Sequence, residues 1–304
     1  MGVDAGVRTI HSSRKHLMAN NGNPGANAHG AQWLDVLIES LSAVRHSPLG
    51  ETLPKFPSVE MQQNTTGLSA EAALRQAHAF YRDVDHACES IGRGMRPETR
   101  VLDFGYGWGR ISRVFMEKVS VDNIYGVDVD PSFAAMTADL FGSDHFGVCA
   151  PFPPTAFADA SFDMVIAYSV FSHLSEQACT QWMGEFARLV RPGGIVAWTT
   201  RHESFFDFCR WAADQGDTTS GYIQALGKLF PDLDDARRRY RNGELVHATS
   251  EGVGGGGPRD VSFYGETWIP ERYARERFAE HFSLVGGYFD GAKYDQACFV
   301  FQRR

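Results

Sequence analysis

The chain has 304 residues, 43% of them hydrophobic, and a formal net charge of −8. This length suffices for one large α/β domain with additions or for two small domains, and it needs no disulfide or metal staple. The acidic balance argues against nucleic acid or an anionic membrane as the main partner, because both reward clustered Lys and Arg. The five cysteines lack C-x-x-C spacing and no apolar run reaches signal-peptide or membrane-span length, so we expect reduced thiols, no metal site and a cytoplasmic protein.

Residues 1–65 are predicted to form an N-terminal extension that is only partly ordered. Residues 1 to about 30 include a stretch rich in Asn, Gly and Ala, a composition that cannot build a core. Apolar residues between Trp33 and Val44 then recur at helical spacing and predict a helix. The segment 47–67 contains three prolines and is interpreted as a connector.

A strongly amphipathic helix is predicted next. Apolar residues within 74–91, Tyr81 among them, fall on one face of a helix. Ser69 is placed to cap its start and Gly92 its end. We expect this helix to open the main domain, at residues 66–202.

From residue 100 onwards, short apolar runs alternate with helical segments. Five strands are predicted, at 101–104, 124–127, 146–149, 162–167 and 195–199. The helices between them have clear starting signals, since Asp130 and Pro131 open one helix and Ser175 caps another. This βαβ alternation predicts an α/β fold, in which a parallel sheet carries helices on both faces.

After the fifth strand the alternation breaks. Residues 203–262 contain two or three helical segments and a glycine run at 254–257, and we interpret them as a helical insertion. The elements that follow are a helix at 271–281 and strands at 282–288 and 297–302. We expect residues 263–304 to complete the core.

The turn after the first strand is the most informative feature. It reads Asp103-x-Gly105-x-Gly107-x-Gly109 and leads into a helix. Three glycines at alternate positions let the backbone turn sharply and approach a ligand, and the helix that follows offers free N–H groups. Asp128 ends the second strand, about 20 residues further on, where a carboxylate accepts hydrogen bonds from ribose hydroxyls. Together these residues predict a site for a nucleoside-type cofactor.

Four segments in order resemble the class I S-adenosylmethionine-dependent methyltransferases. The glycine turn is similar to their first motif, and Gly126-Val127-Asp128 is similar to their second. Residues 159–165 resemble the segment that enters their fourth strand, and residues 189–194 resemble the turn before their fifth. Nicotinamide and flavin dehydrogenases use G-x-G-x-x-G instead; here the third glycine comes one residue early, so a dehydrogenase is the remote alternative.

The resemblance implies a Rossmann-like fold: a seven-stranded, mostly parallel sheet with helices on both faces and an antiparallel last strand. It places S-adenosylmethionine across the ends of strands one, two and four. The residues expected around the cofactor are Asp103, Gly105, Tyr106, Gly107, Arg110, Asp128, Val129, Cys149, Ala150, Ser169 and Tyr81. Among these, the glycine turn would surround the amino-acid part, Asp128 would hold the ribose and Val129 would pack on the adenine.

Some of these assignments carry an open alternative. Cys149 and Ala150 stand where the family often has an Asp or Asn for the adenine amine, which leaves that contact to the backbone or to another side chain. Arg110 is equally placed to contact a ligand or to pair with a neighbouring acid. Tyr81 is included because helices before the first motif often close over the cofactor in this family, and Trp108 either covers the cofactor or packs.

The candidate catalytic residues follow the fourth and fifth strands. Tyr168 and Ser169 would lie near the reacting methyl. His173 is the sharpest candidate for a base, since an imidazole titrates near neutral pH, although a buried histidine bonded to the backbone is the slightly favoured explanation. Arg201 and His202 leave the fifth strand at the edge where substrates bind in open α/β sheets, and the alternative for them is an exposed loop pair. Three residues, Tyr264, Glu266 and Trp268, would cap the pocket or pack.

The resulting hypothesis is a methyltransferase that moves a methyl group from S-adenosylmethionine to an O, N or S atom of a small molecule, with residues 203–262 as a lid that selects the acceptor. The run Ala167-Tyr168-Ser169-Val170 lacks the N/D-P-P-Y/F pattern of methyltransferases that act on nucleic-acid bases. The alternatives are a protein methyltransferase and a non-catalytic regulator that binds the cofactor. Self-association stays open.

Overall fold

A computed structural model describes residues 28–216, 221–250, 252–253, 257–291 and 295–304. The weak order predicted for residues 1–30 and most of the glycine run at 254–257 therefore lie outside the described residues.

The strands form one mixed sheet. Their bounds are Val101–Phe104 (β1), Ile124–Asp128 (β2), Phe146–Val148 (β3), Phe162–Ala167 (β4), Val190–Arg201 (β5), Val246–Ala248 (β6), Glu266–Trp268 (β7), Phe282–Tyr288 (β8) and Gln296–Arg303 (β9). The strand order is β3-β2-β1-β4-β5, with β9 next to β5 and β8 next to β9. Strands β1 to β5 pair in parallel, and β9 is antiparallel to both its neighbours. The predicted seven-stranded sheet is thus confirmed.

Two short strands extend this sheet at the carboxyl end of β5. Arg201, the last residue of β5, pairs in parallel with Trp268 of β7, and β7 pairs antiparallel with β6. Both strands belong to the region around the helical insertion, and neither was predicted.

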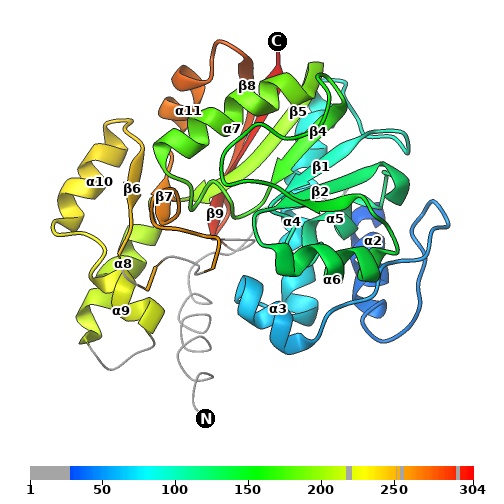
Figure 1. The fold of residues 1–304 in the computed structure, drawn as a ribbon, viewed down its shortest axis with the longest axis horizontal. Coiled ribbons are helices and arrows are strands. Elements are labelled where there is room, and N and C mark those ends of the chain that lie inside the picture. Colours follow the sequence, from blue (N-terminus) through cyan, green and yellow to red (C-terminus); the bar gives the residue numbers. More distant parts are fainter. Residues whose placement is uncertain (1–27, 217–220, 251, 254–256, 292–294) are drawn as a thin grey trace.

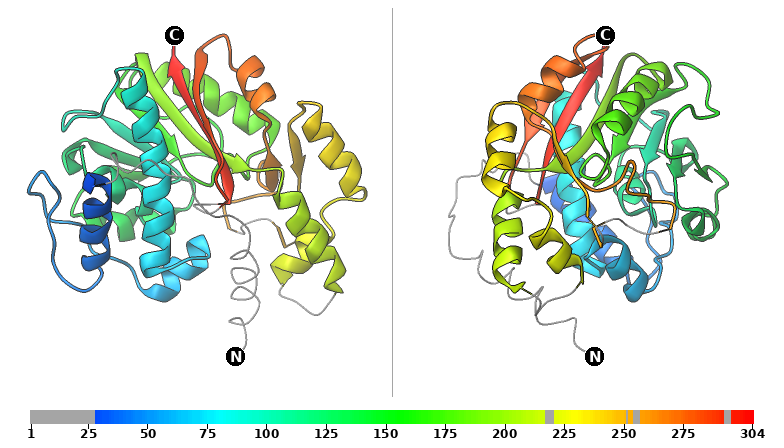
Figure 2. Two further views of the ribbon diagram at one scale, coloured as in Figure 1. Left: turned by 180° about the vertical axis from the view of Figure 1, so that it is seen from behind. Right: turned by 60° about the vertical axis from the view of Figure 1, so that its left-hand side comes forward.

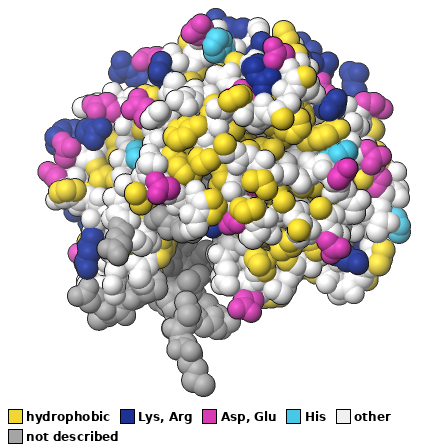
Figure 3. Space-filling view, in the orientation of Figure 1, with side chains coloured by type: hydrophobic (Ala, Val, Ile, Leu, Met, Phe, Trp, Pro, Cys, Tyr) yellow, Lys and Arg dark blue, Asp and Glu magenta, His cyan; other side chains and the backbone are white. Residues whose placement is uncertain are grey.

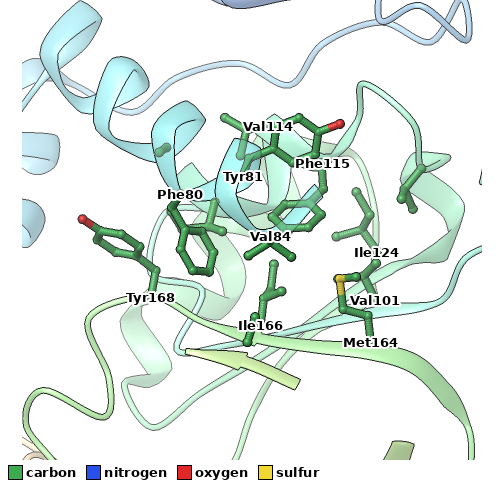
Figure 4. Packing of buried hydrophobic residues seen from close by; sticks show 14 of the residues in the cluster. Phe80, Tyr81, Val84, Val101, Val114, Phe115, Ile124, Met164, Ile166 and Tyr168 are labelled. Carbon is green, nitrogen blue, oxygen red and sulfur yellow. The ribbon is translucent and has the colours of Figure 1, made fainter. Parts of the chain in front are cut away.

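Helices cover both faces of the sheet (Figures 1 and 2). Their bounds are Ala28–Glu39 (α2), Val59–Thr66 (α3), Ala70–Ser90 (α4), Arg110–Phe115 (α5), Pro131–Phe141 (α6), Glu176–Leu189 (α7), Phe205–Asp214 (α8), Gly221–Gly227 (α9), Leu233–Arg241 (α10) and Glu271–Arg277 (α11). Neighbouring strand residues point to opposite faces, so Val101 belongs to the core beneath α2, α4 and α5, and Leu102 to the core beneath α7 and α11. Figure 4 shows part of the first core, where Tyr81 and Val84 of α4 meet Phe115 of α5.

The insertion has a small core of its own. Phe206 of α8 stacks on Trp268 of β7, with ring centroids 4.6 Å apart, and Phe230 packs on the same indole. Helices α8, α9 and α10 therefore gather around a residue of the main sheet, at the end of the molecule where β6 and β7 lie (Figures 1 and 2).

Several local signals act as predicted, and others do not. The side chains of Asp130 and Ser175 cap α6 and α7. Ser69 precedes α4 but makes no side-chain cap. The segment interpreted as a connector contains α3, which has no apolar stripe: its one buried residue is Gln62, whose amide oxygen accepts from Ala70 N at 2.8 Å.

The described part of the predicted N-terminal extension packs against the main domain. Trp33 and Leu37 of α2 are buried in the main core, and the Trp33 indole donates to Val114 O at 3.0 Å. This part of the chain completes the layer over α5. Within the described ranges, every helix is too short or too polar to span a bilayer.

Candidate active site

The glycine turn joins β1 to α5 at the carboxyl edge of the sheet. Gly105 and Gly109 have φ angles of 78° and 75°, which favour glycine. A Cβ at Gly105 would collide with Val170, and one at Gly109 would collide with the ring of Phe141. A Cβ at Gly107 would lie 3.6 Å from the Thr65 methyl, so α3 stands beside the turn.

Asp103 lies buried directly before this turn, with 1% of its surface exposed. Its Oδ2 accepts from Ser112 Oγ at 2.6 Å, while Oδ1 is buried without a hydrogen-bond partner among the described residues. Burial raises the pKa of this carboxyl to about 7. An unsatisfied buried carboxylate oxygen is costly, and the ammonium group of an amino-acid ligand would satisfy it.

Asp128 ties the end of β2 to the turn. Its Oδ2 accepts from Gly107 N at 3.1 Å and its Oδ1 from Asp130 N at 2.9 Å. Each oxygen keeps a lone pair for a ribose hydroxyl, and burial raises the pKa of the group. Arg259, from the end of the insertion, reaches Asp130 at 3.2 Å and so brings the insertion to this corner.

The predicted adenine residues follow β2 and β3. Val129 is half-buried beside Asp128, and Cys149 N donates to Asp128 O at 2.9 Å. Burial raises the pKa of the Cys149 thiol to about 12, so it is a neutral, weakly polar group. Ala150 is exposed. The structure therefore places Val129 and Cys149 beside Asp128.

The aromatic residues of the turn are packed. Tyr106 is 3% exposed and lies against the ring of Phe146, with centroids 5.2 Å apart. Trp108 is 1% exposed, and the Arg113 guanidinium lies 5.1 Å from its ring centroid. Packing is thus the observed role of Trp108.

Arg110 connects three parts of the site. Its Nη1 donates to Gln76 Oε1 of α4 at 2.7 Å, and its guanidinium lies 4.8 Å from the ring centroid of Tyr168. Phe80 of α4 contacts the same tyrosine ring at 5.2 Å. The hydrogen bond of Arg110 thus goes to an amide and not to a neighbouring acid, and α4 does reach the site.

Tyr81 does not share this position. It is fully buried, and its ring packs edge-on against Phe115 near the far end of α5, with centroids 5.1 Å apart. Figure 4 shows Tyr81 beside Phe115, while its neighbour Phe80 turns towards Tyr168. The residues of α4 that approach the predicted site are Gln76 and Phe80.

Ser169 is held in an uncommon conformation just after β4, with φ at 60°. Its N–H donates to Thr199 Oγ1 at 2.7 Å, and its Oγ accepts from Gln296 Nε2 at 2.9 Å. Thr199 Oγ1 in turn donates to Gln296 Oε1 at 2.6 Å. Non-glycine residues with positive φ are strained and are found most often at functional sites. Ser169 is held in this conformation by its position after β4 and by its bonds to Thr199 of β5 and Gln296 of β9.

His173 is half-buried and stacks on Tyr264, with parallel rings whose centroids are 4.8 Å apart. Its Nδ1 lies 2.8 Å from Gly265 O, and a carbonyl only accepts, so Nδ1 carries the proton of the neutral ring and Nε2 keeps its lone pair. Burial lowers the pKa of His173. The contact of Nδ1 with the backbone therefore does not exclude a role of His173 as a base, because Nε2 keeps its lone pair.

His202 has the opposite tautomer. Its Nδ1 accepts from Ser204 N at 3.2 Å and lies 3.1 Å from Ser204 Oγ, and its ring stacks on Phe289. A backbone N–H only donates, so Nε2 carries the proton of the neutral ring. His202 thus helps to start α8, and its free nitrogen is a donor.

Arg201 is not part of an exposed loop pair, which corrects the alternative considered above. It lies in β5, 7% exposed, and its Nε donates to Glu266 Oε2 at 2.6 Å. Burial would lower its pKa, but Glu266 and further anionic groups raise it. Its guanidinium lies 4.0 Å from the ring centroid of Phe205 and 3.7 Å from Asp295. The charge of Arg201 is thus compensated within the protein.

Some residues of this edge were not predicted. They are Gln76, Thr199, Tyr222, Asp295 and Gln296. All five come from segments outside the four motifs, and none carries a local pattern that marks it. A surface cavity of about 430 Å³ lies elsewhere, around Arg93 and Arg191 at the amino ends of β4 and β5.

Residues 102–198 match a family model described as "Methyltransferase domain". The match covers β1 to the end part of β5 and includes the glycine turn, Asp128 and His173. This match spans the four motifs and agrees with their resemblance to the class I S-adenosylmethionine-dependent methyltransferases. The unpartnered oxygen of Asp103 and the remaining lone pairs of Asp128 would suit the ammonium and ribose groups of S-adenosylmethionine.

Several solved structures are similar to this chain. The 1,6-didemethyltoxoflavin-N1-methyltransferase of Burkholderia thailandensis is 17% identical, with 94% of this chain and 93% of that chain covered and a TM-score of 0.47. The amino pentose methyltransferase CalS10 of Micromonospora echinaspora is 12% identical, with 82% and 98% covered and a TM-score of 0.48. A methyltransferase of Methanosarcina mazei is 13% identical, with 71% and 96% covered and a TM-score of 0.44. These values are too low to transfer an acceptor.

Proposed function

We propose that this protein is an S-adenosylmethionine-dependent methyltransferase that acts on a small molecule, and that the O, N or S nucleophile of this molecule loses a proton to Nε2 of His173. The observation that carries the proposal is the tautomer of His173, which follows from the contact of Nδ1 with Gly265 O at 2.8 Å. A neutral imidazole with a free Nε2 is the form that a general base requires. Hydroxyl, thiol and ammonium groups gain most from such a base.

The cofactor supplies the methyl group from its sulfonium sulfur. The chain's own residues must then align the nucleophile with that methyl and keep water out. Asp103 would bind the ammonium and Asp128 the ribose hydroxyls. Ser169 and Tyr168 would line the space in which the acceptor approaches, since both follow β4 directly.

Residues 203–262 would form a lid over this space. The segment that leaves the insertion is bonded to the loop that carries His173: Gly265 N donates to His173 O at 2.8 Å, and Thr267 N donates to Ser172 O at 2.8 Å. The domain division that we propose keeps residues 203–262 as the unit that selects the acceptor. Binding of the acceptor against this unit would therefore act directly on the position of the base.

The charge distribution favours a small acceptor over nucleic acid. On the face seen in Figure 3, the Lys and Arg side chains are interspersed with Asp and Glu and form no single basic patch among the described residues. A phosphate backbone is bound by such patches. The proposal includes a cytoplasmic location, because the five cysteines are expected to be reduced thiols.

Calorimetry with S-adenosylmethionine, followed by transfer of a labelled methyl group into a metabolite extract, tests the proposal. We expect label in the small-molecule fraction, and its loss in His173→Gln without loss of cofactor binding. His281→Gln, which alters a half-exposed histidine, is the matched control. Label found only in the protein fraction would support a protein methyltransferase, and binding without transfer into any fraction would support a regulator.

A further inference from the structure

One buried carboxylate links the candidate base to the insertion. Glu266 of β7 is fully buried. Its Oε2 accepts from Arg201 Nε at 2.6 Å, and its Oε1 accepts from Tyr222 Oη at 2.9 Å. The same Oε1 lies 3.6 Å from His173 Nδ1. Glu266 therefore contacts β5, helix α9 and the loop after β4 at once.

Stability alone gives little reason for this arrangement. A buried ion pair such as Arg201–Glu266 is often no more stabilising than apolar residues of the same volume, because both charges lose their hydration. Tyr222 is 41% exposed as a residue, but its hydroxyl, which accepts from Arg201 Nη2 at 3.4 Å, is not turned to solvent. It is instead directed at Glu266, on the oxygen that faces His173.

We propose that Glu266 is a positioning residue for His173, and that Tyr222 of α9 competes with His173 for the same carboxylate oxygen, so that docking of the insertion adjusts the base. The catalytic consequence depends on the proposed function, whereas the contact itself does not. When α9 moves away, Oε1 loses its hydrogen bond from Tyr222. It can then interact more strongly with the Nδ1–H group of His173.

The charged groups that face His173 come from several elements. Burial has the largest effect and lowers its pKa; Glu266 raises it, and Arg201 and Arg259 lower it. His247 of β6 also acts on His173 electrostatically. Glu266 thus opposes the burial and the two arginines, which makes the protonation of His173 sensitive to this one carboxylate.

The test is an NMR titration of the histidine rings in the full chain without acceptor. His173→Gln identifies the His173 signal. In Glu266→Gln, we expect the pKa of His173 to fall by about one unit, because the opposite charge nearby is removed. In Tyr222→Phe, we expect it to rise, because Oε1 then interacts with Nδ1–H alone. Glu276→Gln, on the exposed face of α11, should leave it unchanged.

The use of two variants keeps the proposal testable even if one of them does not fold. Glu266→Gln leaves the charge of Arg201 unpaired, but Tyr222→Phe keeps the ion pair and alters one hydroxyl. No shift in Tyr222→Phe, or a shift of the opposite sign, overturns the proposal, and so does an unchanged pKa in folded Glu266→Gln. If both shifts appear but methyl transfer does not depend on His173, then the proposed base is wrong and the positioning contact stands.

Discussion

Two buried carboxylates with different surroundings define the cofactor edge at the scale of single residues. Both oxygens of Asp128 accept backbone N–H groups, which fixes its orientation. Asp103 has one oxygen bonded to Ser112 and one without a partner. Burial raises the pKa of both groups, so each should respond to a cationic ligand. The response should be larger for Asp103, which has fewer hydrogen bonds to stabilise its charge.

Binding of S-adenosylmethionine should release a proton from Asp103. Because the pKa of Asp103 is about 7 in the free protein, an ammonium bound beside it should favour the ionised form. We expect the affinity to rise by up to about tenfold per pH unit below pH 7 and to level off above it. Calorimetry in buffers of different ionisation enthalpy counts the protons released.

Two variants control this measurement. Asp103→Asn should bind more weakly and release no proton, whereas Asp139→Asn, at an exposed position on α6, should behave like the unaltered protein. Equal proton release in Asp103→Asn and the unaltered protein would assign the effect to another group.

At the scale of elements, the turn between β1 and α5 depends on one contact across the sheet. Gly105 lies against Val170, which follows β4. Two strands that are neighbours in space thus require glycine at one point of the turn. The same turn is held from the other side by Asp128, whose carboxylate binds Gly107 N.

Gly105→Ala should destabilise the fold more than Gly142→Ala. Both glycines have positive φ, 78° and 63°, and each substitution should cost about 1–2 kcal/mol for the left-handed conformation. Only at Gly105 does the added Cβ meet another side chain, since nothing lies within 4 Å at Gly142. Urea unfolding measures the difference, and equal losses would show that Val170 moves aside freely.

The insertion forms a second element whose stability can be separated from that of the cofactor edge. Phe206 is 1% exposed and stacks on Trp268. Phe206→Ala should therefore cost about 3–5 kcal/mol locally and loosen α8 to α10. Phe208→Ala, on the half-buried side of the same helix, should cost less.

We expect Phe206→Ala to keep its affinity for S-adenosylmethionine within a few fold and to lose methyl transfer. Limited proteolysis should cut within residues 203–262 first. Loss of cofactor binding together with transfer would mean that the insertion is not a separate lid.

At the scale of the whole molecule, burial of the Asp103 carboxyl makes the stability of the fold depend on pH. Its pKa is about 7 in the folded chain against a usual value of 3.8, so the folded state holds the proton more tightly. Its contribution is favourable at low pH and is lost as the pH rises through 7.

Asp103→Asn should therefore make the free protein more stable, by an amount that grows between about pH 4 and pH 7 and is constant above. Chemical unfolding at several pH values measures this difference. A difference that does not vary with pH would show that Asp103 ionises normally in the folded chain.

Local signals predicted much of the fold correctly. The bounds of β1 and β4 agree with the predicted 101–104 and 162–167, and Asp163 closes the turn before β4 by accepting from Arg100 N at 2.7 Å. Helix α3 was missed because caps and an amide hydrogen bond hold it without an apolar stripe. The contact of Tyr81 with Phe115 was not predicted, because the face of α4 shows that a residue is buried but not which neighbour buries it.

The sequence by itself determined seven of the strands, the caps of α6 and α7, the glycine turn and its two carboxylates, because each depends on residues close along the chain. Only the tertiary structure decided the state of His173, since its partner Gly265 is 92 positions away. It also placed Arg201 in a buried pair with Glu266 and brought Tyr222 to the same carboxylate. Proton positions and charge pairing depend on distances in space, and packing of the insertion against the sheet sets these distances.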